Sequence, residues 1–311
     1  MEAALTRRPL ALAAASLLLG ASTSGEGLPP KQADLVAKLR ARVAAVDARL
    51  DGVLGVYVRD LATGATIELR PDEVFPTASS IKLAVLYELY RQAAEGRIQL
   101  TELVAPPRNP VPSEGILRFM SPPTRLTLRD LGLLVMSLSD NEGANELIRH
   151  VGMDAVNRRL DTLSLKATRL RRLMLDIEAA RRGEENVSTP REMARLVEVV
   201  ALGEGLPADL AADLRTVATV PDPGSYFRKG LPEEQLAISK AGTLEGVRCE
   251  AAWVDVPGRP YSAAIMTAYL RREKDGEEAI AEISSALHDT FDRLSHSSEY
   301  GRIISDRVSA K

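Results

Sequence analysis

One short motif brings a hydroxyl together with a group that could activate it. A Ser-Ser-Ile-Lys sequence at residues 79–82 stands at the start of an apolar stretch. Residues three apart on a helix are neighbours, so Lys82 can reach the Ser79 hydroxyl. A serine is a weak nucleophile until a base removes its proton, and a lysine can be that base when an apolar environment lowers its pKa. The motif therefore indicates acyl transfer to Ser79, with the free backbone N–H groups of a helix start available to an oxyanion.

Two further motifs supply polar groups that such a reaction needs. A Ser-Asp-Asn sequence at residues 139–141 puts a hydroxyl, a carboxylate and an amide at the end of an apolar stretch. A Lys-Ala-Gly-Thr sequence at residues 240–243 precedes a strand-like run, where the lysine offers a cation and the glycine an approachable backbone N–H. Each motif alone also fits an ordinary turn, so their joint occurrence carries the interpretation.

The composition excludes several classes of protein. The 311 residues include 40 Lys and Arg against 43 Asp and Glu, a net charge of −3 that argues against a nucleic-acid-binding protein. Hydrophobic residues make up 45%, which is ordinary for a globular chain. The single cysteine, Cys249, excludes an intrachain disulfide and cysteine-based metal sites. The three histidines, His150, His288 and His296, are far apart, so we expect no metal site.

The first 24 residues are typical of a secretory signal. Arg7 and Arg8 precede an apolar run at residues 9–19, and small residues follow as far as Ser24. The run is too short to span a bilayer, which needs about 20 residues. No cysteine follows that could carry a lipid. We therefore expect a periplasmic or secreted protein with no membrane anchor after cleavage near Ser24.

The hydrophobic pattern predicts helices at both ends and through the middle of the chain, with strands near the ends. Apolar residues recur at three- and four-residue steps in the helical segments and alternate in the strands. The predicted helices cover about 33–49, 80–94, 128–138, 143–150, 190–203, 208–217 and 276–294. The predicted strands cover about 53–59, 66–70, 247–256 and 261–269. Two proline-rich connections, at 106–123 and 221–232, are expected to be irregular.

This order of elements predicts an α/β (α+β) fold. Strands at both ends would form one antiparallel sheet flanked by helices, and the helical middle would be inserted as a separate lobe. We expect a discontinuous α/β lobe from residues 25–75 and 225–311, and a helical lobe from residues 76–224. A cleft between two such lobes is a natural site for a small ligand.

The three motifs, in this order, match the pattern Ser-x-x-Lys, Ser-Asp-Asn, Lys-Thr/Ser-Gly. The chain therefore resembles the serine β-lactamase and penicillin-binding protein superfamily, and class A β-lactamases most closely. The resemblance covers nearly the whole chain after the signal. It implies a β-lactamase-like fold without a cofactor, and a small-molecule β-lactam as the partner of a monomeric enzyme.

The resemblance also implies catalytic roles. Ser79 would be the acylated nucleophile and Lys82 the lysine that activates it. Ser139 would relay a proton to the leaving lactam nitrogen. These roles agree with the chemistry that the residue types allow.

Substrate-binding roles follow for the remaining motif positions. Asn141 would hold the substrate's side-chain amide, and Lys240 would attract the substrate carboxylate. The backbone N–H groups of Ser79 and Thr243 would form the oxyanion hole. Gly242, next to Thr243, would leave the backbone there open to the substrate.

The sequence departs from the family pattern at two places. Ala241 stands where the family usually has a threonine or serine, so a hydroxyl that helps bind the substrate carboxylate is missing. Class A enzymes also carry a glutamate that activates the deacylating water in the loop before the Thr-Pro helix, and residues 171–180 lack that Glu-x-x-Leu-Asn pattern. Asp176 or Glu178 could serve as this base, or both could be solvated and paired with Arg181 or Arg182.

Three functions are consistent with these observations. The leading hypothesis is an exported serine β-lactamase that hydrolyses the β-lactam amide through a Ser79 acyl-enzyme and so confers antibiotic resistance. The first alternative is a penicillin-binding or β-lactam-sensing protein that is acylated without turnover, which the altered loop motivates. The second is a related serine hydrolase that acts on another ester or amide, which Ala241 and the loop both motivate.

Overall fold

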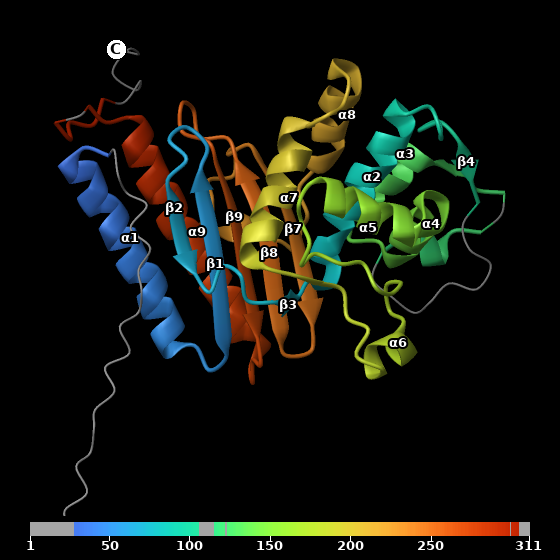
Figure 1. Ribbon diagram of the computed structural model, residues 1–311, viewed down its shortest axis with the longest axis horizontal. Coiled ribbons are helices and arrows are strands. Elements are labelled where there is room, and N and C mark those ends of the chain that lie inside the picture. The colour runs from blue at the N-terminus through green and yellow to red at the C-terminus, as the bar shows by residue number, and fades with distance from the viewer. Residues whose placement is uncertain (1–27, 106–114, 122, 299, 305–311) are drawn as a thin grey trace, which may run out of the picture.

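The computed structural model describes residues 28–105, 115–121, 123–298 and 300–304. The predicted secretory signal therefore lies outside the described residues, as does part of the first proline-rich connection. A central sheet separates two groups of helices (Figure 1). Within the described residues, no helix combines the length and the apolar character needed to cross a membrane.

The sheet takes strands from both parts of the chain, as predicted for this fold class. Its five antiparallel strands follow the order β2-β1-β9-β8-β7. Val56 pairs with Ile265, so the first strand of the chain lies beside the last. The strands are β1 (Val53–Asp60), β2 (Thr66–Leu69), β7 (Ala237–Leu244), β8 (Val247–Val254) and β9 (Tyr261–Ala268). This order leaves β7 at one edge, with the Lys-Ala-Gly-Thr motif on it.

Two long helices cover one face of the sheet. They are α1 (Pro30–Arg49) and α9 (Glu273–Ser295), which pack against each other (Figure 1). Leu39, Val43 and Val46 give α1 a buried face at the spacing that the sequence predicts. Both helices extend a few residues beyond the predicted bounds, mainly at their N-terminal ends.

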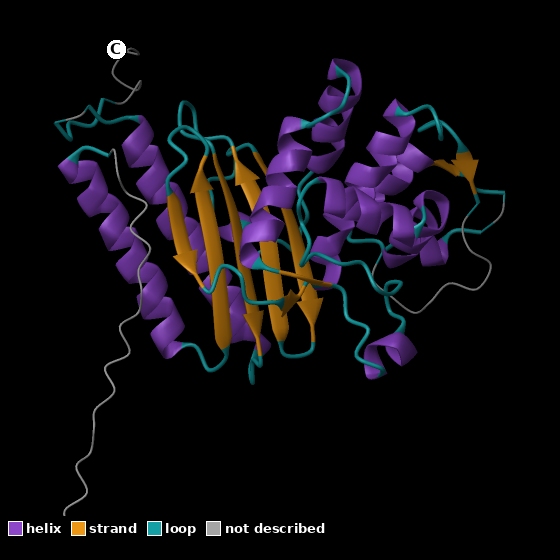
Figure 2. Ribbon diagram, viewed as in Figure 1, coloured by secondary structure: helices purple, strands orange, loops and turns teal. Residues whose placement is uncertain are grey.

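The remaining α-helices form a second group that packs on the opposite face and beside β7 (Figure 2). α2 is the central helix of this group, because ten of its thirteen residues are buried. α7 packs on the sheet and also contacts α2 and α8, so it connects the sheet to the other helices of this group. The helices are α2 (Lys82–Ala94), α3 (Leu128–Ser137), α4 (Asn141–Val151), α5 (Met153–Thr162), α6 (Ile177–Arg181), α7 (Pro190–Leu202) and α8 (Ala208–Ala218).

Capping hydrogen bonds explain where two of these helices begin. Thr127 accepts a hydrogen bond from the Asp130 backbone N–H at 3.0 Å, and Thr189 accepts one from the Glu192 N–H at 3.2 Å. A threonine at these positions satisfies a backbone donor that the helix cannot pair itself. The predicted starts of these helices, at about residues 128 and 190, are therefore confirmed.

Short elements account for most differences from the sequence prediction. The helix expected from residue 80 begins as a 3-10 turn, η1 (Ala78–Ile81), before α2. The proline-rich connections, expected to be irregular, contain two more such turns. α5, α6 and two short strand pairs were also not predicted, nor was the longer strand β7, because the sequence places the Lys-Ala-Gly-Thr motif before a strand and not on one. These other elements are η2 (Leu117–Phe119), η3 (Arg228–Gly230), the pair β3 (Phe75–Pro76) and β6 (Val187–Ser188), and the pair β4 (Leu103–Val104) and β5 (Leu126–Thr127).

Candidate active site

One cleft, of about 410 Å³, brings together residues from all three sequence motifs. Ser79 enters it from η1, Ser139 and Asn141 from the start of α4, and Thr243 from β7. Eleven further residues complete the lining: Ala78, Arg172, Met174, Leu175, Ile177, Asn186, Asp222, Gly224, Tyr226, Ala241 and Leu244. The cleft therefore joins the sheet edge to the helical part of the chain.

Lys82 connects the first motif to the second. It is the first residue of α2, and its side chain is fully buried. Its Nζ donates to the Ser139 carbonyl at 2.6 Å, to Ser139 Oγ at 3.1 Å and to Asn141 Oδ1 at 2.8 Å. These contacts hold the Lys82 amino group beside the second motif, one helical turn from Ser79.

The central residue of the second motif has a structural role. Asp140 caps α4 through a hydrogen bond from the Gly143 N–H at 2.9 Å. Its other oxygen accepts from the backbone N–H groups of Ile116 and Leu117, at 2.8 and 3.0 Å. Gly115 has a φ of 107°, and a Cβ there would lie 2.3 Å from the carboxylate. Asp140 thus fixes the 115–117 segment against the start of α4.

The third motif places β7 in direct contact with η1. A Cβ on Gly242 would lie 2.3 Å from the Thr77 carbonyl oxygen and 2.5 Å from Cys249 Sγ, so only glycine allows this approach. The Ser80 hydroxyl donates to the Lys240 carbonyl at 2.9 Å. β7 is therefore fixed beside the nucleophile's turn, and Ala241 and Thr243, two residues apart, both line the cleft.

Cys249 lies behind this contact and is buried. Its Sγ donates to the Thr77 carbonyl at 2.8 Å. Burial raises the pKa of the thiol to about 12, so it stays protonated at neutral pH. Only the thiolate is a strong nucleophile, and Cys249 therefore acts as a packing residue.

Lys240 does not face the cleft as the family resemblance implies. Its side chain is fully buried, and its Nζ lies 2.5 Å from Asp222 Oδ2. Asp222 is the member of this ion pair that lines the cleft. Sequence reasoning missed Asp222, because it lies in a Pro-Asp-Pro-Gly sequence that is typical of a turn.

The loop before α7 presents apolar side chains to the cleft. Asn145 holds the Met174 backbone on both sides: the Met174 N–H donates to Asn145 Oδ1 at 2.7 Å, and Asn145 Nδ2 donates to the Met174 carbonyl at 3.1 Å. The Met174 side chain lines the cleft together with Leu175 and Ile177. Sequence reasoning also missed Met174, which carries no polar group to mark it.

The two carboxylates proposed from the sequence as deacylation bases lie elsewhere. Asp176 caps the short helix α6 and accepts from the Ala179 N–H at 2.9 Å. Glu178 is exposed and pairs with Arg181 at 2.6 Å. Among the described residues that line the cleft, neither is present. Each carboxylate therefore already has a partner, a backbone N–H for Asp176 and a guanidinium for Glu178.

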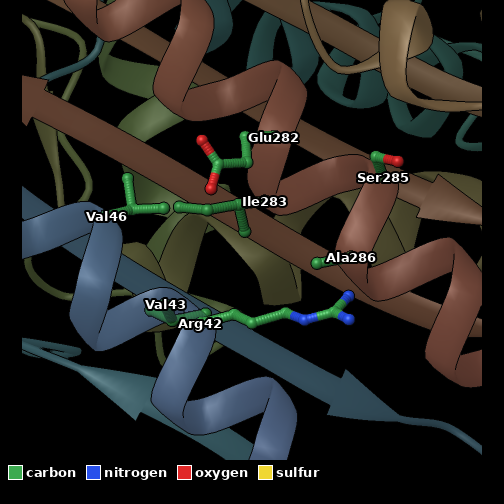
Figure 3. Close-up of a pocket in the computed structure, with 7 residues that line it drawn as sticks. All are labelled: Arg42, Val43, Val46, Glu282, Ile283, Ser285 and Ala286. Atoms are coloured by element: carbon green, nitrogen blue, oxygen red, sulfur yellow. The ribbon is translucent and has the colours of Figure 1, made fainter.

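Elsewhere in the described residues, neither a second pocket nor a metal-binding cluster offers a competing reaction site. A pocket of about 370 Å³ lies between α1 and α9, with Arg42, Val43 and Val46 facing Glu282 and Ile283 (Figure 3). It contains one serine, Ser285, but no lysine or histidine that could activate it. Within the described part of the chain, no group of three or more His, Cys, Asp or Glu residues is placed to hold a metal ion.

The fold and the cleft together define a serine hydrolase in which a buried lysine, not a histidine, accompanies the nucleophile. The chain belongs to the beta-lactamase enzyme family, whose sequence profile matches residues 38–291. The predicted superfamily and fold are thereby confirmed.

Curated relatives and solved structures agree with this membership. The β-lactamase of Streptomyces albus G is 28% identical over 294 residues, covering 90% of this chain and 93% of that protein. The β-lactamase of Streptomyces fradiae is 30% identical over 234 residues, covering 72% and 76%. The β-lactamase structure from Sphaerobacter thermophilus has a TM-score of 0.73 at 28% identity, covering 82% of this chain and 97% of that one. The PBP-A structure has a TM-score of 0.75 at 25% identity, covering 83% and 97%.

Proposed function

We propose that this protein is a serine β-lactamase that opens β-lactams on Ser79 and hydrolyses the resulting acyl-enzyme slowly. The observation that carries this proposal is the set of hydrogen bonds from Lys82 Nζ to Ser139 and Asn141, beside the nucleophile. Relatives named β-lactamase at about 30% identity support the same activity. A mutant of PBP-A is an acyl-enzyme complex with penicillin G, which supports acylation by a β-lactam on this fold.

The proposed acylation uses residues that line the cleft together with the buried Lys82, which contacts two of them. Lys82 accepts the Ser79 proton as the serine oxygen bonds to the lactam carbonyl carbon. The backbone N–H groups of Ser79 and Thr243 stabilise the oxyanion. The carbon–nitrogen bond of the lactam then breaks, Ser139 passes its proton to the departing nitrogen, and the proton held by Lys82 returns to Ser139 Oγ, which lies 3.1 Å from Nζ. Asn141 holds the substrate's side-chain amide.

The proposed slow step is deacylation. Hydrolysis of the acyl-enzyme requires a base that activates a water, and such bases contribute about 10²–10⁴-fold. The loop side of the cleft presents Met174, Leu175 and Ile177, which have no such group. This observation favours a second candidate function, a penicillin-binding or β-lactam-sensing protein in which the adduct persists.

An intact-mass time course with excess benzylpenicillin tests the proposal. We expect an adduct that forms within the experiment and clears slowly while the drug is consumed. The Ser79→Ala variant should form no adduct, and adduct formation in that variant would refute the role of Ser79. An adduct that never clears would support the second candidate, and no adduct at all would contradict both functions.

We also propose that the protein is exported, acts as a monomer and confers resistance to β-lactams. The basic, apolar and small-residue segments at positions 7–24 support export. Expression in a susceptible host, with and without residues 1–24, would test export and resistance together. Only the full chain should raise the β-lactam concentration that the host tolerates. Light scattering of the purified protein would test the monomer.

A further inference from the structure

A carboxylate, that of Asp222, lines the β7 end of the cleft. Asp222 lines the cleft at 7% exposure, whereas its partner Lys240 is fully buried behind it. The Lys240 Nζ lies 2.5 Å from Asp222 Oδ2. A ligand entering the cleft therefore meets a carboxylate first, and the ammonium is already paired.

Apart from the buried Lys240, no cationic side chain of the described residues lies at this end of the cleft lining. Among the described residues that line the cleft, the charged ones are Asp222 and Arg172. Arg172 belongs to the loop side, where its guanidinium donates to Glu185 at 2.8 Å and to the Leu173 carbonyl at 3.3 Å. At the β7 end, Ala241 brings a methyl group where a hydroxyl could have donated to an anion.

Hydrogen bonds hold Asp222 in this position. Its second oxygen, Oδ1, accepts from the Gly224 N–H at 2.8 Å. The following segment is bound to β8 by the buried Glu250, which accepts from the backbone N–H groups of Tyr226 and Phe227, both at 2.9 Å. Moving Asp222 out of the cleft would break its own hydrogen bond and leave Lys240 buried without a counter-charge, which is costly.

We infer that Asp222 determines specificity by disfavouring substrates that carry a carboxylate at the β7 end of the cleft. The inference rests on the proposed acylation of Ser79. Two carboxylates a few ångströms apart in a partly buried site repel each other more strongly than in water. The acyl donors that this site favours therefore carry a neutral or cationic group there, and the charge acts as a repulsive specificity element.

Benzylpenicillin and its methyl ester test this inference, because they differ in the charge of one group. The rate of Ser79 acylation by each compound is measured by intact mass. We expect the wild-type protein to react with the ester at least as fast as with benzylpenicillin. Asp222→Asn should raise the ratio of the benzylpenicillin rate to the ester rate by at least tenfold, whereas Asp222→Glu, which keeps the charge, should not.

Two controls separate a local effect from a general one. Glu245→Gln removes an exposed negative charge from the β7–β8 turn and should leave the rate ratio unchanged. Salt provides a test that needs no variant, since added salt screens repulsion between charges. In the wild type, the benzylpenicillin rate should rise with ionic strength while the ester rate stays constant.

The outcomes distinguish this inference from the proposed function. A wild-type protein that reacts tenfold faster with benzylpenicillin than with the ester, without a rise in its rate in salt, would overturn the inference alone. An unchanged rate ratio in a folded Asp222→Asn variant would do the same. Adducts with neither compound would overturn the proposed function, and the inference with it.

Discussion

Replacing Met174 with glutamate tests whether deacylation is limited by the missing base. The two side chains have similar lengths, and two hydrogen bonds with Asn145, one accepted and one donated by its side chain, fix the Met174 backbone. The new carboxylate should therefore occupy the space of the methionine side chain, on the wall of the cleft that holds Ser79. Met174 is 6% exposed, so burial should raise the pKa of this carboxyl toward neutrality, where a general base works best.

The Met174→Glu substitution should greatly increase the rate of deacylation and change the rate of acylation little. A positioned general base contributes about 10²–10⁴-fold, which corresponds to about 3–5 kcal/mol of activation free energy. The burial of a carboxylate should cost about 1–3 kcal/mol of folding stability. Acylation should change little, because none of the hydrogen bonds of Lys82 and Ser139 described above involves residue 174.

The assay follows the benzylpenicillin adduct by intact mass after excess drug is removed. Met174→Gln is the matched control, because it has the same length and polarity without a base. We expect the adduct of Met174→Glu to clear at least a hundredfold faster than that of the wild type, and that of Met174→Gln to clear at nearly the wild-type rate. Equal clearance in the glutamate and glutamine variants would refute the reasoning.

Three further predictions concern other parts of the site. Lys82→Met should slow adduct formation by about 10²–10⁴-fold, since it removes the proposed base, and a loss below tenfold would contradict that role. Gly242→Ala should lower the free energy of unfolding by about 1–3 kcal/mol, because its Cβ would lie 2.3 Å from the Thr77 carbonyl oxygen. Denaturant unfolding would show this loss, and an unchanged midpoint would contradict the close approach. Burial raises the pKa of Glu250 to about 7 from its usual 4.5, so the folded state binds more protons between these values. Stability should therefore fall by up to about 3 kcal/mol as the pH rises through this window, and Glu250→Gln should remove that slope in urea unfolding measured at pH 5 and 7.5.

The sequence predicts much of the fold because its apolar patterns are long. The runs that became β8 and β9, and the apolar α2, allow few alternatives to a buried strand or helix. α6 could not be predicted in the same way, since it has only five residues and one buried side chain. Its start depends on Asp176, which the sequence analysis interpreted as a candidate base.

The candidate site was predictable where its residues are close in sequence. Ser79 and Lys82 are neighbours on one helical turn, so their spacing alone indicates contact. The pairing of Asp222 with Lys240 joins residues 18 apart, through a turn and a strand edge. The hydrogen bonds between Asn145 and Met174 join residues 29 apart. Such contacts depend on tertiary packing, so no local sequence pattern predicts them.

In the proposed mechanism, formation and loss of the adduct are under separate control. The proposed acylation depends on Lys82 and Ser139, which hydrogen bonds at the start of α2 and α4 hold in place. The proposed deacylation depends on the loop that Asn145 fixes through Met174, and the inferred substrate preference depends on Asp222. Substitutions in the loop should therefore change how long the adduct lasts, whereas those at Asp222 should change which compounds form it. We therefore expect this protein to be acylated as its relatives are, because it keeps the serine and lysine motifs. We expect it to differ from them in turnover, through the loop, and in preferred substrate, through Asp222.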